Sequence, residues 1–296
     1  MAVIQLVATK PKAKTEPKVT PDERIAVAIS ELNRKFGKGV VVRGVDQAAI
    51  VLDRLPTGSL GLDIGLHGGW LCGHVNVAWA SEGVGKNFVA CRTIALAQQT
   101  GLSAAIICVE SSLDPQWYEL CVVDVDRLYI AYPLTLEEGM ETTVSLVRAR
   151  CGVVVFDSVV GMSTGAEEEK GLQDDGYSTI PSKAGELIRR LQTALQPERS
   201  PKGLDANPSC VLLLNQVREK IGTAPGFDPE YMPGGRGLRH GNHNLVQLRR
   251  IGQISVPRHA WTRSKVGELE RKAWDEPVGQ RIQWKLIHTK FQPQGS

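Results

Sequence analysis

Residues 80–87 read Ala-Ser-Glu-Gly-Val-Gly-Lys-Asn and lie between an apolar run and a segment of helical spacing. In a phosphate-binding loop, Gly-x4-Gly-Lys-Ser/Thr, backbone N–H groups surround the phosphates, the Lys reaches the outer ones and the hydroxyl holds Mg²⁺. Gly85 and Lys86 occupy their expected positions, whereas Ala80 replaces the first glycine and Asn87 replaces the hydroxyl. The loop therefore predicts nucleotide binding and leaves open whether the nucleotide is hydrolysed.

Three further polar residues, each at the end of an apolar run, could complete such a site. Asp157 is the carboxylate expected to hold Mg²⁺ through water. Glu110 could orient and deprotonate an attacking water. Gln216 could sense the terminal phosphate and pass its state to the loop that follows. Taken singly, Asp157 is also explained as a strand-end cap and Glu110 as a solvated carboxylate, but the order of these residues along the chain favours the nucleotide site.

The elements that must position these residues alternate between strand and helix from residue 51 onward. The expected strands are Val75–Trp79, Ala104–Val109, Leu128–Ala131, Val153–Phe156 and Val211–Leu214, with later strands at 245–254 and 281–288; the expected helices are 86–99, Gly139–Arg150 and Ala184–Leu195. This alternation predicts an α/β fold whose sheet is parallel at its core and covered by helices on both faces. Ligands bind at the carboxyl ends of strands in such sheets.

Two long polar segments interrupt this pattern, at residues 161–182 and 218–243. Both contain glycines and lack an apolar period. Loops of this length in a compact domain are usually functional or disordered. Because both segments follow strands that end in candidate site residues, we expect them to be functional.

The N-terminal region differs in composition from the rest of the chain. Residues 1–20 are expected to be a disordered basic tail, either solvated or in contact with nucleic acid, because they combine lysines with Pro and Thr. Pro21 is expected to begin a helix with Thr20 as its N-cap. Its apolar stripe comprises Ile25, Val27, Ala28, Ile29, Leu32 and Phe36, and Val40–Val42 are expected to form a short strand. Because residues 21–45 are too few to fold alone, the stripe must dock on the chain's own body or on a neighbour.

Composition excludes several classes of protein. The 296 residues carry a net charge of only +3, which does not by itself imply a polyanionic partner. None of the six cysteines forms a Cys-x-x-Cys pair, so no zinc site is indicated. No apolar stretch is long enough to span a membrane, and no signal peptide is recognisable. We expect a protein of the reducing cytosol with no membrane partner.

The order of these motifs resembles the RecA/UvsX family of homologous-recombination ATPases, and the match to bacterial RecA-type proteins covers about residues 24–290. Since the family has bacterial and viral members, the resemblance implies a cytoplasmic protein of a bacterial cell or a phage-infected host. The segments that carry the resemblance are Leu-Asn-Arg-Lys-Phe-Gly-Lys-Gly at 32–39, Pro-Thr-Gly-Ser-Leu-Gly-Leu-Asp at 56–63, Glu-Ser-Ser-Leu-Asp-Pro at 110–115, Val-Val-Val-Phe-Asp-Ser-Val at 153–159, Asn-Gln-Val-Arg-Glu-Lys-Ile-Gly at 215–222, Gly-Gly at 234–235 and Arg-Arg-Ile-Gly at 249–252. The resemblance implies a RecA-type P-loop ATPase core over residues 46–296, preceded by a polymerisation element at 21–45. Bacterial members of the family continue into a small C-terminal domain, and we expect this sequence, which stops at Ser296, to depart from them by having no separate C-terminal domain.

The resemblance also implies ATP and Mg²⁺ as cofactors and a role for each matching residue. The implied catalytic residues are Glu110 as base, Lys86 as phosphate ligand and Gln216 as γ-phosphate sensor. The implied ATP contacts are Ser81, Glu82, Gly83, Val84, Gly85, Lys86, Asn87, Phe88, Asp114, Trp117, Asp157 and Lys290, with Asn87 and Asp157 as metal ligands. Trp117 would stack on the adenine. Lys290, with His288 as a weaker companion, would reach the ATP of a neighbouring subunit.

The two polar segments match the family's two DNA-binding loops. The implied DNA contacts are Tyr177, Ser182, Lys183, Arg218, Lys220, Gly234, Gly235, Arg236 and Arg239. The first segment also carries an acidic cluster, Glu167–Glu169 with Asp174 and Asp175, which should repel phosphate wherever it faces DNA.

The leading hypothesis is an ATP-dependent recombinase that forms a helical filament on single-stranded DNA and exchanges strands with a homologous duplex. One alternative is a filament that binds ATP and DNA but hydrolyses poorly, because Asn87 mis-sets the metal. The other is a RecA-like accessory protein that acts on a partner. Retention of Glu110 argues against the first alternative, and the helix after Pro21 favours self-assembly over the second.

Overall fold

The computed structural model describes residues 20–37, 40–41, 53–108, 115–159, 161, 180–200, 203–219, 230–263 and 269–290. The chain divides into two compact units. One comprises residues 1–50 and 199–205, and the other comprises residues 51–198 and 206–296.

Helix α1 (Pro21–Phe36) is the main element of the smaller unit, and it begins where the sequence predicts. The Thr20 hydroxyl accepts a hydrogen bond from the Glu23 N–H at 3.3 Å, and the Glu23 carboxylate accepts one from the Thr20 N–H at 2.7 Å. These reciprocal bonds form a capping box that satisfies otherwise unpaired donors. No residue of α1 is buried.

The apolar stripe of α1 differs in one member from the expectation. At 3.6 residues per turn, Val27 lies about 200° around the helix from Ile25. The stripe therefore runs through Ile25, Ala28, Ile29, Leu32 and Phe36, of which Ile25 and Phe36 are more than half exposed. Val27 projects from the opposite side.

The expected strand at Val40–Val42 is wrong for its described part, because Val40 and Val41 form a bend. The Asn33 side-chain oxygen accepts hydrogen bonds from the backbone N–H groups of Val40 and Val41 at 3.1 and 3.3 Å. Their donors are thus directed to α1 and not to a neighbouring strand. Val42 lies outside the described residues.

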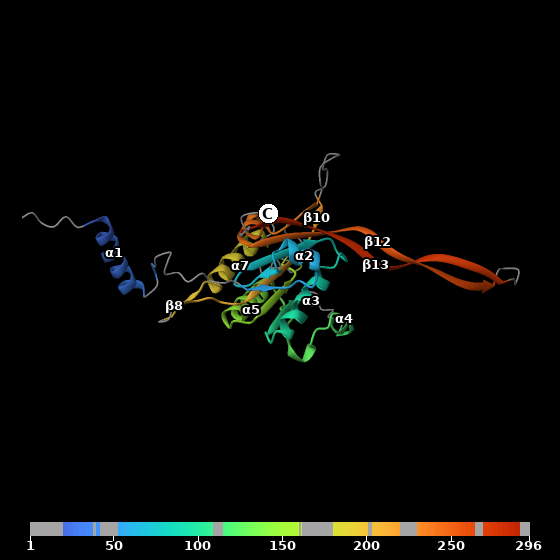
Figure 1. Cartoon of the computed structure of the whole chain (residues 1–296), viewed down its shortest axis with the longest axis horizontal. Coiled ribbons are helices and arrows are strands. Elements are labelled where there is room, and N and C mark those ends of the chain that lie inside the picture. The colour runs from blue at the N-terminus through green and yellow to red at the C-terminus, as the bar shows by residue number, and fades with distance from the viewer. Residues whose placement is uncertain are drawn as a thin grey trace, which may run out of the picture. The chain divides into compact units, whose positions relative to one another are not determined.

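A mixed sheet of seven strands forms the centre of the larger unit (Figure 1). Its order is β13 (Leu269–Thr289), β12 (Asn244–Arg263), β3 (Val75–Ala80), β9 (Cys210–Gln216), β6 (Val153–Asp157), β4 (Ala104–Cys108) and β5 (Leu128–Ala131). Every neighbouring pair is parallel except β12–β13, which is antiparallel. The predicted α/β fold with a mostly parallel sheet is confirmed.

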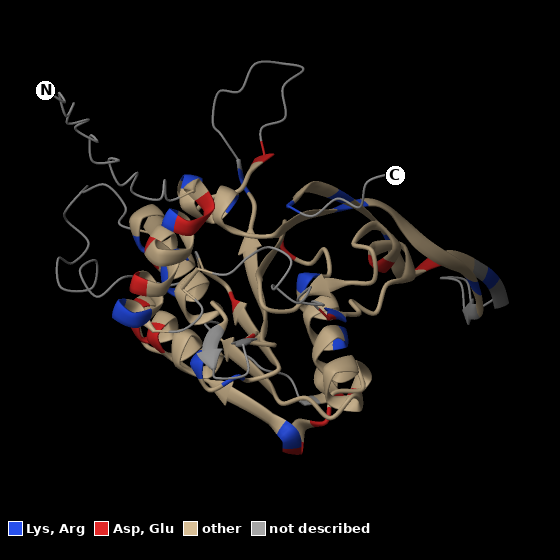
Figure 2. Ribbon diagram, turned by 60° about the vertical axis from the view of Figure 1, so that its left-hand side comes forward, with Lys and Arg blue, Asp and Glu red and all other residues tan. Residues whose placement is uncertain are grey.

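Helices cover both faces of this sheet, and each central strand contributes side chains to two separate cores. In β9, Leu212 and Leu214 pack into the core that contains α3 (Lys86–Gln99), whereas Val211 and Leu213 pack into the core that contains α5 (Leu136–Arg148) and α7 (Ile180–Ala194). Burial on both faces explains why these strands are apolar throughout. Charged residues gather on the helices and on the hairpin, as Figure 2 shows.

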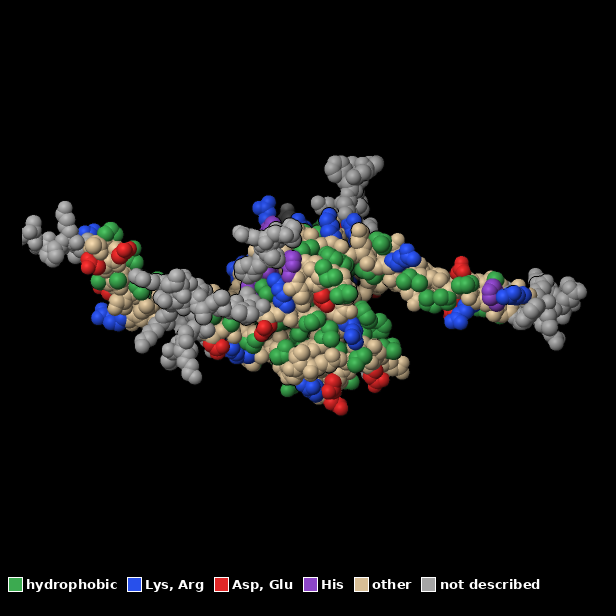
Figure 3. All heavy atoms as spheres, viewed as in Figure 1, with side chains coloured by type: hydrophobic (Ala, Val, Ile, Leu, Met, Phe, Trp, Pro, Cys, Tyr) green, Lys and Arg blue, Asp and Glu red, His purple; other side chains and the backbone are tan. Residues whose placement is uncertain are grey.

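The β12–β13 hairpin is much longer than the expected strands at 245–254 and 281–288. Its distal part extends beyond the core and carries exposed apolar side chains, as Figures 1 and 3 show. Ile254, Trp274 and Val278 are among them. Cross-strand pairing continues to Arg263↔Leu269 through three register shifts. Backbone pairing alone extends these strands, so the apolar pattern used to predict them ends too early.

Three other boundaries differ from the expectation. Helix α5 begins at Leu136, three residues before Gly139, because the Thr135 hydroxyl caps it. Helix α7 begins at Ile180 with Pro181 in its first turn, so residues 180–182 are helical and not part of the first loop. The second loop is partly ordered, since β10 (Arg218–Glu219) pairs with β11 (Glu230–Tyr231) and is followed by α8 (Gly235–Gly241).

The remaining elements are short. They are β1 (Arg54–Leu55) paired with β2 (Trp70–Leu71), α2 (Leu60–Gly65), α4 (Pro115–Leu120), a 3₁₀ turn at Val125–Arg127, and β7 (Glu198–Ser200) paired with β8 (Gly203–Asp205).

All six cysteines are buried free thiols. Burial raises the pKa of the Cys91 thiol, which therefore behaves as a small apolar side chain. No described helix is both long and apolar enough to cross a membrane.

Candidate functional site

The phosphate-binding loop connects β3 to α3. Gly83 and Gly85 have φ angles of 68° and 106°, in the left-handed region that other residues adopt only with strain. These conformations direct the chain into α3, whose first N–H groups have no partner within the helix. The N-terminus of a helix preceded by such a loop favours anions, because unpaired N–H groups and the helix dipole act together.

Lys86, the first residue of α3, is nearly buried and folds back onto the loop. Its Nζ donates hydrogen bonds to the carbonyl oxygens of Ala80 and Ser81, both at 3.0 Å. These neutral acceptors bind an ammonium group less strongly than phosphate oxygens do. The geometry therefore holds the cation beside the position that a phosphate would take.

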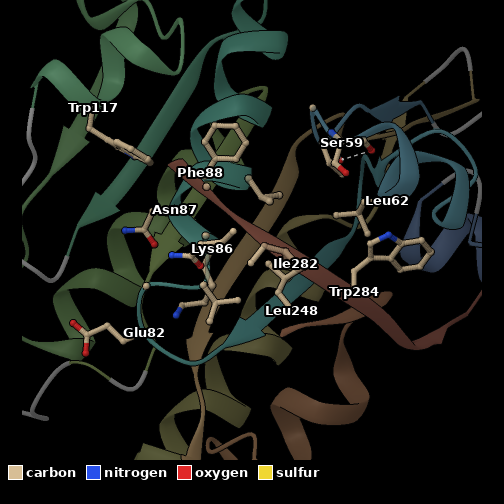
Figure 4. Close-up of a pocket in the computed structure, with 18 of the residues that line it drawn as sticks. Ser59, Leu62, Glu82, Lys86, Asn87, Phe88, Trp117, Leu248, Ile282 and Trp284 are labelled. Atoms are coloured by element: carbon tan, nitrogen blue, oxygen red, sulfur yellow. Dashed lines mark hydrogen bonds between the residues drawn. The ribbon is translucent and has the colours of Figure 1, made fainter. Parts of the chain in front are cut away.

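A cavity of about 900 Å³ opens around this loop (Figure 4). The predicted site residues that line it are Glu82, Gly83, Val84, Gly85, Lys86, Asn87, Phe88, Trp117, Asp157 and Gln216. Trp117 and Trp284 lie on opposite sides of the start of α3. The tertiary structure thus brings together residues from the ends of β3, β6 and β9, as the sequence predicts.

Phe88 and Trp117 form an aromatic pair at one side of the cavity. Their ring centroids are 6.3 Å apart with an interplanar angle of 63°, an edge-to-face arrangement. Both rings are close to half exposed. Since an exposed aromatic face can stack on a planar base, this side suits the base of a nucleotide.

The donor set fits a bound Mg²⁺. Asn87 and Asp157 line the same cavity and supply an amide oxygen and a carboxylate. Mg²⁺ prefers oxygen ligands and usually retains several waters beside one or two carboxylates and substrate phosphates. When bound, it would neutralise charge on the phosphates. Asn87 would hold it in place of the usual hydroxyl.

Most of the opposite wall of the cavity was missed by sequence reasoning. It is formed by Thr57, Ser59, Leu62, Leu248, Val278, Gln280, Ile282 and Trp284. The motif at 56–63 marks the first three of these residues. Nothing in the local sequence marks the others, because strand pairing and packing of the hairpin bring them to the loop.

A second cavity, of about 390 Å³, joins the two predicted DNA segments. Ile180 and Pro181 line it from the first turn of α7, and the remaining lining residues are Arg218, Tyr231, Met232, Pro233, Gly234, Gly235, Arg236 and Arg239. Three guanidinium-bearing residues thus surround one hollow. Arg218, Gly234, Gly235, Arg236 and Arg239 were each predicted as DNA contacts.

Other predicted DNA and ATP residues lie elsewhere. Lys183 Nζ is 3.6 Å from a carboxylate oxygen of Glu137 and 3.5 Å from one of Glu186. Neither Ser182 nor Lys183 lines the second cavity, and Ser81 is not among the lining residues of the first. Glu110, Asp114, Tyr177 and Lys220 lie outside the described residues.

Lys290 follows β13 and does not line the nucleotide cavity of its own chain. Its backbone N–H donates a hydrogen bond to the His243 carbonyl at 3.2 Å. Burial lowers the pKa of His288, and the nearby Lys290 charge adds to this effect. The expected companion of Lys290 is therefore largely neutral at neutral pH.

Comparison with known proteins agrees with this geometry. A model of the RecA N-terminal domain matches residues 23–274. The chain is 33% identical over 268 residues to Protein RecA of Rubrobacter xylanophilus, covering 90% of this chain and 70% of that protein. It is 31% identical over 272 residues to Protein RecA of Clostridium acetobutylicum, covering 91% and 70% respectively. The chain belongs to the RecA family.

Proposed function

We propose that this protein is an ATP-dependent DNA recombinase that assembles on single-stranded DNA and promotes pairing and strand exchange with a homologous duplex. The observation that carries this proposal is the short connection between the two cavities. Gln216 at the end of β9 lines the nucleotide cavity, and Arg218, two residues later, lines the arginine-rich cavity. A change at the nucleotide can therefore reach the DNA segment through two residues of backbone.

The nucleotide cavity supports ATP as the ligand. Lys86 and the first N–H groups of α3 would hold the phosphates, and Trp117 would stack on the base. Asp157 and Asn87 would hold Mg²⁺. Glu110 remains the proposed base for the attacking water.

The arginine-rich cavity supports DNA as the partner. Arg218, Arg236 and Arg239 are suited to phosphate oxygens, and Tyr231 is the one aromatic residue among the lining residues. Binding should therefore depend mainly on the backbone and tolerate many sequences. Affinity for single strands should fall with the logarithm of salt concentration, with a slope of about −0.7 for each phosphate neutralised.

Two surfaces support self-assembly into a filament. The stripe of α1 leaves Ile25 and Phe36 exposed, so this helix needs a partner. Strand β5, at the edge of the seven-stranded sheet, exposes Tyr129 and Ile130, with Leu134 exposed nearby. An edge strand with apolar side chains is a template for pairing with another chain. A head-to-tail contact between copies generates an open helix when its rotation does not close.

Asn87 supports a second candidate function, a filament that binds ATP and DNA but hydrolyses slowly. The side-chain amide is longer than a hydroxyl and presents its oxygen at a different angle. A metal held this way could be displaced from the phosphates. The two candidates differ in turnover and agree on binding.

The test is ATP hydrolysis with and without single-stranded DNA, with Lys86→Ala as the blank. Strong stimulation by DNA that vanishes in the blank would support the recombinase. Binding of DNA that requires ATP, without hydrolysis, would favour the second candidate. Light scattering with DNA and a non-hydrolysable ATP analogue should show large assemblies in both cases, and small discrete oligomers would contradict both.

A further inference from the structure

Glu230 lies in β11, where the second DNA segment returns to the core, and its carboxylate contacts two other parts of the larger unit. Its Oε1 is 3.4 Å from the Ser81 hydroxyl in the phosphate-binding loop. Its Oε2 is 2.7 Å from Nη2 of Arg249 in β12. The side chain is about three-quarters shielded from solvent, with 23% of its surface exposed. A single carboxylate thus joins the nucleotide loop to the DNA segment.

The residue that precedes the same segment, between β9 and β10, is also tied to the loop. The Val217 N–H donates a hydrogen bond to the Ala80 carbonyl at 3.1 Å. Ala80 and Ser81 are the two residues whose carbonyls accept from Lys86 Nζ. Val217, just before the DNA segment, and Glu230, within it, therefore contact Ala80 and Ser81, whose carbonyls hold Lys86.

We propose that Glu230 is a positioning residue that couples occupancy of the nucleotide loop to the conformation of the second DNA segment. The inference rests on the proposed function. Phosphate oxygens compete with the Ala80 and Ser81 carbonyls for Lys86. When Lys86 turns to the phosphate, Ser81 loses a backbone contact, and its hydroxyl shifts relative to Glu230.

The ion pair with Arg249 links the shift of the Ser81 hydroxyl to the position of β11. The Arg249–Glu230 ion pair holds the carboxylate against β12, so movement of Ser81 changes how strongly β11 is held to the core. Coupling of this kind needs an element with two arrangements that both sites bias. Gln216 lines the nucleotide cavity itself, whereas Glu230 is not among the residues that line it. Glu230 would therefore act through the loop and not by touching the nucleotide.

The experiment measures the affinity for a labelled oligothymidylate with and without a non-hydrolysable ATP analogue. Glu230→Gln keeps the size of the side chain and its ability to accept from Ser81, but removes the charge that pairs with Arg249. Glu276→Gln is the matched control, because Glu276 forms an ion pair with Arg258 on the hairpin. Circular dichroism of each variant checks the fold.

In the wild type and in Glu276→Gln, the analogue should raise affinity for DNA by the same factor. In Glu230→Gln, this factor should fall by about fivefold or more, within the usual range of coupling between sites. The Kd for the ATP analogue without DNA should change less than twofold, because Glu230 does not line the nucleotide cavity. A merely structural role would lower DNA affinity equally with and without the analogue.

Ser81→Ala provides a second route to the same contact. Ser81→Ala removes the hydroxyl that donates to Glu230, so the factor by which the analogue raises DNA affinity should fall in this variant as well. Full coupling in Glu230→Gln, alongside a coupled wild type, would overturn this inference and leave the proposed function intact. A wild type whose DNA affinity ignores the nucleotide would overturn both.

Discussion

The indole of Trp284 in β13 packs directly against the backbone of Gly65 in α2. A Cβ at residue 65 would lie 2.1 Å from Cη2 of Trp284, closer than any real contact. The same indole lines the nucleotide cavity. The absence of a side chain at Gly65 therefore sets how closely the hairpin approaches the nucleotide site.

Gly65→Ala should destabilise the protein, contrary to the usual effect of this substitution. In a helix, Ala is normally more stable than Gly by about 0.5–1 kcal/mol. Here the added methyl collides with a ring, and overpacking of this kind costs about 1–3 kcal/mol. Urea unfolding should show the loss. The KM for ATP should rise as Trp284 is displaced.

The matched control for this change is Gly61→Ala. A Cβ at residue 61 would lie 3.4 Å from the Trp284 indole nitrogen, an ordinary contact. This variant should be as stable as the wild type or more so. Equal destabilisation by both substitutions would show that the contact with Trp284 does not decide the effect.

Asn87→Thr should increase ATP turnover. Threonine restores the short hydroxyl of the common loop pattern, which ligates Mg²⁺ directly. Single-turnover hydrolysis over a range of Mg²⁺ concentrations would measure the change, with less Mg²⁺ needed for half-maximal rate. Asn87→Ala is the control and should lower turnover. If turnover is the same with Asn, Thr and Ala, residue 87 is not a metal ligand.

Ile25→Glu should prevent assembly of the protein on DNA, because it places a charge in the exposed stripe of α1 that we propose docks on another copy. Light scattering with single-stranded DNA and an ATP analogue would detect the loss. Val27→Glu makes the same chemical change on the opposite side of the helix and should leave assembly intact. Assembly by the Ile25 variant, or its loss in both variants, would contradict the proposed interface.

Stability should fall as pH falls, because His243 is buried. Burial lowers the pKa of His243 to about 3, with further contributions from His74, Arg54, Lys290 and His288. The unfolded chain binds this proton near pH 6.5. The contribution of His243 is therefore complete above pH 6.5 and is lost as pH falls from 6.5 towards 3, with a slope approaching about 1.4 kcal/mol per pH unit.

The measurement is urea unfolding at pH 7 and pH 5. His243→Gln should show a shallower fall in unfolding free energy between these two values than the wild type. His74 and His288, whose pKa values burial also lowers, should leave part of the slope in the variant. His259→Gln, at an exposed position on the hairpin, should retain the full slope.

The sequence alone predicted the phosphate-binding loop, the strands that lie beside it along the chain, and a sheet that is parallel at its core. Lys86 was predicted from the loop pattern, and Asp157 and Gln216 were predicted because apolar runs ending in polar residues mark the carboxyl ends of parallel strands. The exact match of α3 to residues 86–99 follows from the loop and the apolar period together. These features are local, so short stretches of sequence encode them.

Tertiary structure alone decided which distant residues complete the site. The hairpin wall with Trp284 depends on the register between β12 and β13, and the Glu230 contacts depend on where β11 lies beside the loop. The distal hairpin lacks the apolar alternation that predicts a strand, because backbone pairing and not burial extends it. Contacts of this kind join residues far apart in the chain, and packing, not local pattern, selects them.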